Sequence, residues 1–286
     1  MDAEVFRAWI TSAARVIEAN RDHLTQLDAA IGDADHGINL DRGFTAVLRA
    51  LDARNGAAAH MTPGRILALT GSTIISEVGG AAGPLYGMAF RRAGQALGDA
   101  TDVDLPGLSA ALDAALAGVQ RLGAARQGDK TMVDALQAAT RAFSEAIAAG
   151  ASPDDALSVL ADAASAAAQG TVPMQALKGR ASYLGPRSVG HEDPGAASTA
   201  LILGALRDAV RSTGTQLSAD RTTPPRPAPR SRDTARAASP TRRTSSSRVP
   251  GASRRSAAPT TPIAPATAPS RDTIGAAIPA SPTVAS

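Results

Sequence analysis

Residues 152–168 read SPDDALSVLADAASAAA, and this stretch has the pattern of a single α-helix. Ser152 is a suitable cap and Pro153 suits the first helical turn. Behind this start, apolar residues recur at intervals of three and four, the spacing of one helix face. The same spacing recurs along the chain, and no useful length alternates as a β-strand does. The windows are residues 3–22, 39–54, 63–76, 84–98, 105–123, 130–149, 153–168 and 194–211.

These windows predict an all-α fold. Most connections between them are short, which favours antiparallel neighbours. Aromatic residues make up only 2% of the chain and alanine is abundant. The helices must therefore pack closely, with Leu, Ile and Val as the main side chains of the core. We therefore expect a barrel or bundle of eight antiparallel up-and-down helices over residues 1–212.

The last quarter of the chain has a different composition. Residues 213–286 hold 12 of the 19 prolines and 11 arginines against three aspartates, a net charge of +8, so residues 1–212 carry about −5 of the overall +3. Such a segment has too few large apolar groups to offset the entropy of ordering. It predicts a disordered tail, and without aromatics for base stacking a nucleic-acid role is disfavoured.

The chain contains no cysteine, which excludes disulfides and thiolate sites. Its first residues, MDAEVF, are acidic where a signal peptide is basic. No apolar run reaches the roughly 18 residues of a membrane span. The sequence predicts a cytoplasmic protein that does not contact a membrane.

Four connections differ from ordinary short loops, and chemistry is expected there. They are residues 24–39, 77–87, 121–132 and 178–195, of which the last lies in a gap too long for a connection without a role. In an up-and-down bundle, the connections after the first, third, fifth and seventh helices share one end. All four should therefore meet.

Asp28, Asp33 and Asp35 are the candidate metal ligands in the first of these connections. Carboxylates without Cys or dominant imidazole suit Mg²⁺ or Ca²⁺ rather than zinc. An EF-hand is excluded, because the twelfth position counted from Asp33 is Phe44 instead of Glu. Asx-turns or helix caps are the alternative, which explains at most two of the three.

Phosphate binding has a candidate in the second connection. Gly79, Gly80 and Gly83 precede Pro84, and free amides at a helix start form an anion site. Close packing of helix ends explains the same glycines. Lys130 and Lys178 lack the spaced glycines of a Walker loop, and no nucleophile motif occurs.

Two histidines, His36 and His191, lie within the unusual connections. They are candidates for positioning groups or polarising phosphate. A hydrogen-bonded structural role is the alternative for each.

Four segments resemble the nucleotide-binding L subunit of dihydroxyacetone kinase, the DhaL family, over about residues 3–210. They are LDAAIGDADHGINLDRGF (27–44), GGAAGPLYG (79–87), GDKTMVDAL (128–136) and GRASYLGPRSVGHEDPGAAS (179–198). The resemblance implies a barrel of eight antiparallel helices that binds ADP or ATP and two Mg²⁺ ions at one end. It implies Asp28, Asp33 and Asp35 as the metal ligands.

The resemblance also implies the nucleotide contacts and assigns no catalytic residue with certainty. Many relatives have Ser at the position of Ala82, which puts one hydroxyl contact to phosphate in doubt. The implied contacts are His36, Gly37, Ile38 and Asn39; Gly80, Ala81 and Ala82; Gly123 and Met132; Arg180; and Asp193, Pro194 and Gly195.

In this family a separate K subunit holds dihydroxyacetone, and the L subunit supplies the phosphoryl donor. We expect the phosphotransferase-system type, in which a phosphocarrier M subunit rephosphorylates bound ADP. Two other functions remain as alternatives: an ATP-exchanging two-subunit ketose kinase and a nucleotide-sensing partner of a transcription regulator. A homodimer is also possible. The nucleotide domain of fatty acid kinase is disfavoured, because its metal loop reads DGDTG where this chain has DADHG.

Overall fold

A computed structural model of the chain describes residues 1–53 and 61–222, and within them it contains helices and no strand. This confirms the all-α prediction. The elements are α1 (Ala3–Ala19), α2 (Arg21–Ile31), α3 (His36–Asp52), α4 (Pro63–Glu77), α5 (Ala82–Leu97), α6 (Leu105–Gly123), α7 (Met132–Ala148), α8 (Pro153–Gly170), the 3₁₀ helix η2 (Arg180–Ser188) and α9 (Pro194–Thr222).

The helix predicted over residues 3–22 is wrong at its C-terminal end, because the structure has two successive helices there, α1 and α2. The side chain of Asn20 donates to the carbonyl of Val16 over 2.8 Å, which ends α1 before Arg21 starts α2. α2 then occupies most of the expected first loop, and only residues 32–35 remain non-helical. The apolar face of α2, with Leu24 and Ile31 buried, is too short to stand out beside the polar residues around it.

Two further boundaries differ. The expected structureless connection before α9 contains η2, and α9 continues to Thr222 where the sequence predicted the tail from residue 213. The next proline after Pro194, which starts α9, is Pro224, so no helix-breaking proline stops α9 before Thr222. The rest of the predicted disordered tail, residues 223–286, lies outside the described residues.

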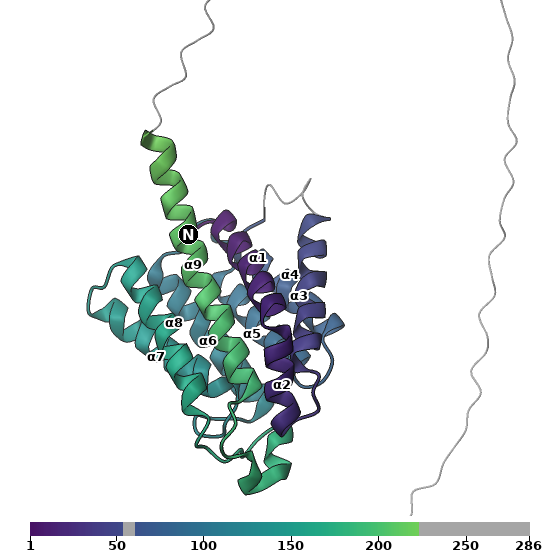
Figure 1. Cartoon of the computed structure of the whole chain (residues 1–286). Helices are drawn as coiled ribbons and strands as arrows, with labels where there is room; N and C mark the ends of the chain where they lie inside the picture. Colours follow the sequence, from purple (N-terminus) through teal and green to yellow (C-terminus); the bar gives the residue numbers. More distant parts are fainter. Residues whose placement is uncertain (54–60, 223–286) are drawn as a thin grey trace, which may run out of the picture. The chain divides into compact units, whose positions relative to one another are not determined.

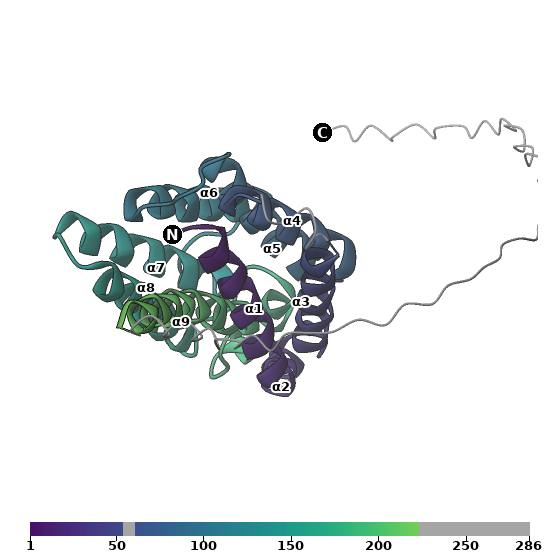
Figure 2. The same ribbon diagram turned by 90° about the horizontal axis from the view of Figure 1, so that it is seen from above.

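The helices form a closed ring. Each of α3 to α9 packs against the next along the chain, α9 packs against α1, and α1 packs against α3 (Figure 2). The broken helix α1–α2 counts as one member of the ring. The expected eight-helix barrel is thereby confirmed.

Small residues allow the closest helix pair. A Cβ atom at Gly71 of α4 would lie 2.5 Å from the carbonyl oxygen of Gly87 of α5, and one at Gly94 would lie 2.5 Å from that of Gly64. The two backbones therefore touch where side chains would otherwise separate them. Phe6, Phe44 and Phe143 are fully buried in the main core, where Leu, Ile, Val and Ala supply most of the other side chains.

The alternating helix directions place the connections after α2, α4, α6 and α8 at one end of the barrel, the lower end in Figure 1. The chain starts at the opposite end, where the Met1 ammonium donates to the Val103 carbonyl over 2.7 Å. No helix in residues 1–53 and 61–222 is long and apolar enough to cross a membrane.

Candidate functional site

Three aspartates converge where α2 gives way to α3. One carboxylate oxygen from each of Asp28, Asp33 and Asp35 lies within 4.8 Å of those of the other two. Asp28 is buried in the last turn of α2, Asp33 is exposed and Asp35 is half-buried. Three anionic oxygens so close together repel one another, and a hard divalent cation relieves that repulsion. The donor set fits Mg²⁺.

Asp28 also caps the following helix. Its Oδ2 atom accepts hydrogen bonds from the amides of Asp35 over 2.9 Å and His36 over 3.2 Å. A Cβ atom at Gly32 would collide with Asp28 Oδ1, so glycine is required beside this carboxylate. The helix-cap alternative thus accounts for Asp28 alone, since the side chain of Asp35 makes no cap bond in α3.

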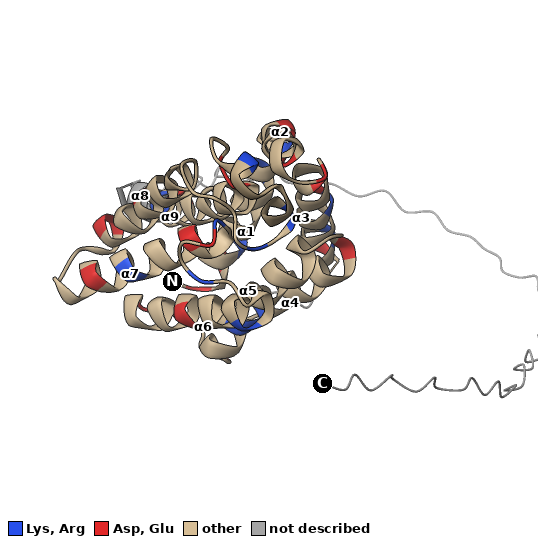
Figure 3. Ribbon diagram, turned by 90° about the horizontal axis from the view of Figure 1, so that it is seen from below, with Lys and Arg blue, Asp and Glu red and all other residues tan. Residues whose placement is uncertain are grey.

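A cation from the long connection reaches the aspartates. The guanidinium of Arg180 lies 2.9 Å from Asp33 Oδ2, and Arg180 is largely exposed. Arg180 therefore links η2, at the start of which it lies, to the α2–α3 connection. Figure 3 looks onto this end of the barrel and shows acidic and basic residues together on its connections.

Four helix N-termini meet at the same end. The starts of α3, α5, α7 and α9 all contribute residues to one cavity of about 160 Å³. The positive ends of helix dipoles and their amides favour anions. At α7 and α9 the first amides are occupied by capping side chains, whereas α5 starts at Ala81 without one. The start of α5 is thus the best placed of the four to receive phosphate oxygens.

The cavity joins most of the predicted site residues, and the expected meeting of the four connections is confirmed. Predicted residues in its wall are Asp28, Asp33, Asp35, His36, Gly80, Ala81, Ala82, Met132, Arg180, Asp193, Pro194 and Gly195. Gly79 of the predicted anion site also lines the cavity. Further wall residues, which the sequence did not assign to the site, are Ile31, Gly32, Leu85, Tyr86, Lys130, Thr131, Lys178, Gly179 and Ala181.

Four of the contacts that the resemblance implies lie outside the cavity wall, as do Gly83 and His191, the other candidates for phosphate binding. Gly37 packs against the carbonyl of Arg21, Ile38 is half exposed, and Asn39 is buried and accepts from Arg42. Gly123 ends α6 next to Leu85, which does line the cavity. The assignments of these four rest on the resemblance alone.

His36 is held by hydroxyl groups that the sequence reasoning did not single out. Its Nε2 atom lies 2.8 Å from Ser198 Oγ, which lies 2.7 Å from the Tyr86 hydroxyl. Burial lowers the pKa of His36 and raises that of Tyr86, so both side chains are neutral near pH 7. Both Tyr86 and Ser198 belong to the quoted motifs, but only the fold shows that they meet.

Asp193 is the buried carboxylate at the start of α9. Its Oδ2 atom accepts from the Ala196 amide over 2.7 Å, as an N-cap does. Burial, with a smaller contribution from the nearby Asp134 carboxylate, raises the pKa of Asp193 to about 7, against the opposing effects of the Ala196 amide and Lys130. The negative charge on this wall of the cavity therefore varies near neutral pH.

An all-helical barrel with a carboxylate cluster beside converging helix N-termini defines a class of proteins that bind a polyanion together with a divalent cation. Within that class, residues 30–208 match the DAK2 domain, and the chain belongs to this family. The family expected from the four motifs is thereby confirmed.

Similar proteins include the ADP-binding subunit DhaL of the PEP-dependent dihydroxyacetone kinase of Escherichia coli (strain K12). It is 41% identical over 203 residues, which cover 71% of this chain and 95% of that subunit. An ADP-binding subunit DhaL of Listeria innocua serovar 6a is 38% identical over 69% of this chain and 92% of that subunit. The triokinase/FMN cyclase of Homo sapiens is 36% identical over 67% of this chain but only 32% of its own length.

A similar solved structure is the dihydroxyacetone kinase of C. freundii in complex with AMP-PNP and Mg²⁺. The TM-score is 0.53 at 28% identity, over 73% of this chain and 34% of that chain. The native form of the same kinase gives a TM-score of 0.53 at 27% identity. This chain thus spans about a third of the length of that kinase.

Proposed function

We propose that this protein is the ADP-binding subunit of a dihydroxyacetone kinase. Residues 1–222 contain its nucleotide-binding domain, and residues 223–286 are a tail that is not needed for binding. The observation that carries the proposal is the carboxylate cluster of Asp28, Asp33 and Asp35 beside the uncapped start of α5 in one cavity. Nearly full-length similarity to subunits named for ADP binding supports it.

Asp28, Asp33 and Asp35 would hold the Mg²⁺ that accompanies the nucleotide, and the resemblance to the family implies two ions. Bound Mg²⁺ supplies charge neutralisation for the transferred phosphoryl group. The chain's own groups position the nucleotide. Amides of Gly80, Ala81 and Ala82 would donate to phosphate oxygens, and Arg180, which also lines the cavity, would add positive charge. Met132 borders the base.

Residues 1–212 offer no evident residue for capturing a small ketone covalently, so a separate K subunit holds dihydroxyacetone. Its docking surface is the rim of the cavity formed by Arg180, Tyr183, Arg187 and His191. Tyr183 on η2 is 88% exposed, so its ring is available for contact with a docked subunit. Docking there brings the phosphoryl group in line with the triose and excludes water.

Bound ADP is rephosphorylated by a phosphocarrier subunit of the phosphotransferase system. This second step is proposed because the similar subunits of E. coli and Listeria belong to enzymes named as PEP-dependent. Exchange of ADP for free ATP is the alternative donor route. Slow release of ADP during repeated turnover would favour rephosphorylation over exchange.

The test is reconstitution with a purified K subunit. Dihydroxyacetone phosphate should form only when the K subunit is present together with Mg²⁺ and either ATP or the phosphorylated carrier. The chain with Mg²⁺-ATP and dihydroxyacetone, but without a K subunit, is the control. Rapid stoichiometric phosphorylation in that control would refute the two-subunit function.

A further inference from the structure

Lys130 is a fully buried cation in the connection before α7. Its side chain has 0% exposure, and its backbone adopts a φ of +60°, a conformation that a residue other than glycine seldom adopts. The ammonium contacts four main-chain carbonyls. They belong to Thr171 at 2.9 Å, Met174 at 3.1 Å, Ser188 at 2.8 Å and His191.

These four carbonyls come from the two ends of one segment, residues 171–193, which we name the wall segment. Its first part supplies Thr171 and Met174, and its last part supplies Ser188 and His191. The two parts also meet directly, since the Gly190 amide donates to the Val172 carbonyl over 2.8 Å. The ammonium of Lys130 therefore joins both ends of the wall segment at one point, in addition to the direct bonds between them.

Apolar packing does little to hold the wall segment. Its buried apolar side chains, Ala176 and Ala181, form a small cluster with Ile31 that is separate from the main core. A segment with so little buried apolar area depends on polar contacts for its order. Four carbonyl oxygens that converge without a cation would repel one another and lose their hydrogen bonds.

We infer that Lys130 is a positioning residue that fixes the wall segment over the nucleotide cavity through its ammonium group. Lys178, Gly179, Arg180 and Ala181 of this segment line the cavity, and the segment ends at Asp193. Lys130 also lines the cavity, but its ammonium is bound to the four carbonyls, so it acts on the nucleotide through the segment that it holds. The inference rests on the proposed function where it concerns nucleotide affinity, but the order of the segment is independent of it.

Lysine suits this position better than arginine. An ammonium is a compact charge whose three hydrogens can point at convergent acceptors, whereas a guanidinium is a flat fork. Lys130→Arg should therefore fail to restore what Lys130→Met removes. The ionised Asp193 carboxylate favours the charged ammonium and so opposes part of the cost of burying it.

The wild-type protein allows a direct test, because the chain has only two lysines, Lys130 and Lys178. With ¹⁵N-lysine, NMR should show one ammonium signal that exchanges slowly with water, from Lys130, and a fast one from the exposed Lys178. Lys178→Arg assigns the signals. Saturating Mg²⁺-ADP should slow the Lys130 ammonium exchange together with the amides of the wall segment. Exchange that is fast, or that stays unchanged while those amides become protected, would overturn the inference.

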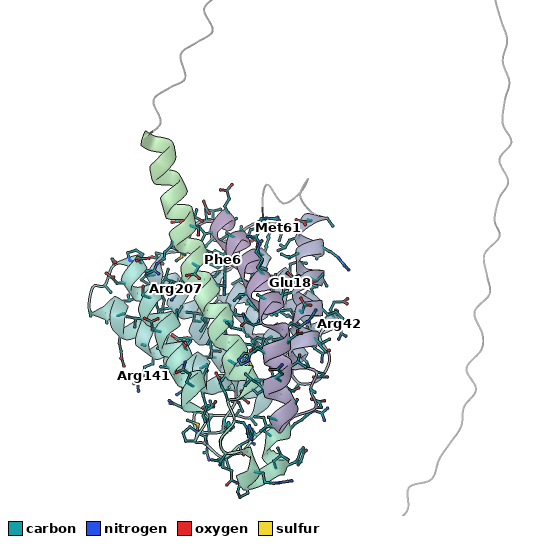
Figure 4. The ribbon with its side chains drawn as sticks, in the orientation of Figure 1. Phe6, Glu18, Arg42, Met61, Arg141 and Arg207 are labelled. Carbon is teal, nitrogen blue, oxygen red and sulfur yellow. The ribbon has the colours of Figure 1, made fainter. Side chains whose placement is uncertain are left out.

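Lys130→Met tests the positioning role. Hydrogen exchange should speed up in residues 171–193, with helical content retained, and Mg²⁺-ADP affinity should fall about 10- to 100-fold. The matched control is Arg141→Met, which removes an exposed cation from the outside of α7 (Figure 4). It should change neither quantity. Wild-type exchange and affinity in Lys130→Met would refute the role.

A double-mutant cycle separates positioning from general stability. If Lys130 acts through Arg180, the double variant Lys130→Met/Arg180→Met should bind Mg²⁺-ADP no more weakly than Lys130→Met alone. Fully additive losses would contradict action through this residue. If wild-type protein bound no Mg²⁺-ADP, the proposed function would fail, while the ammonium signal and the exchange of the wall segment would still decide whether Lys130 fixes it.

Discussion

Asp33→Asn separates the metal role of the aspartates from their structural roles. Asp33 is exposed, and its side chain is paired with Arg180 alone among the contacts described above, whereas Asp28 also caps α3. Asparagine keeps the size of the side chain and removes one negative charge. The substitution should therefore weaken nucleotide binding without unfolding the barrel.

The expected effect on stability in the absence of ligand is small. Asp33 lies within 4.8 Å of two other carboxylates, and each repulsion is worth about 1 kcal/mol in a water-like medium. The exposed pair with Arg180 contributes in the opposite direction, by roughly 0–1 kcal/mol. The two repulsions together exceed the ion pair, so the free energy of unfolding should rise by roughly 1–2 kcal/mol at most.

The effect on ligand binding is larger. Loss of one of three anionic ligands should weaken Mg²⁺-ADP at least about 100-fold, the upper end of what loss of an outer-sphere partner costs. At ADP equal to about 100 times the wild-type Kd, binding stabilises wild type by about 2.7 kcal/mol and the variant by only about 0.4 kcal/mol. For a domain of this size the rise in Tm should fall from roughly 5–10 °C to roughly 1–2 °C.

Thermal unfolding with and without Mg²⁺-ADP measures this difference, and calorimetric titration gives the Kd directly. Asp22→Asn is the matched control, because Asp22 is an exposed aspartate of α2 outside the carboxylate cluster. It should leave the ligand-induced rise unchanged. A full wild-type rise in Asp33→Asn would refute the assignment of Asp33 as a metal ligand.

Three further predictions address the fold around the site. Gly32→Ala should displace the Asp28 carboxylate, lower stability by about 1–3 kcal/mol and abolish Mg²⁺-dependent ADP binding. Urea unfolding measures the stability and calorimetric titration measures the binding. Wild-type values of both would contradict the close contact between residue 32 and Asp28. Because burial raises the pKa of Asp193 from 3.8 to about 7, the folded protein holds a proton between these pH values that the unfolded chain has released. Its contribution to stability should thus fall as pH rises from about 4 to 7, by up to about 4 kcal/mol, and stay constant at higher pH. Asp193→Asn should remove this pH dependence. Equal free energies of unfolding of the wild-type protein at pH 5 and pH 8, measured with urea, would disprove it. Deletion of residues 223–286 should leave the Kd for Mg²⁺-ADP within twofold of wild type, and a large loss of affinity would show that the tail contributes to binding.

The helices were predictable because each has its own periodic apolar face and several have a capping residue. Ser152 before Pro153 is one such start, and the structure begins α8 there. α2 was missed because its apolar face is short and its last turn carries Asp28, which a local pattern cannot distinguish from a loop residue. η2 was missed for a similar reason, since its order depends on contacts from outside its own sequence.

The sequence by itself determined the class of the fold, the family and the aspartates that form the cluster. Helix periodicity is local, and a motif such as GDADHG keeps its ligands within a few residues of one another. Only the tertiary structure decided that Asp28 belongs to a helix, that Tyr86 and Ser198 hold His36, and that Lys130 binds four carbonyls from a segment 41 to 61 residues further along the chain. Those contacts depend on the closure of the helical ring, which brings together groups whose local sequences carry no sign of one another.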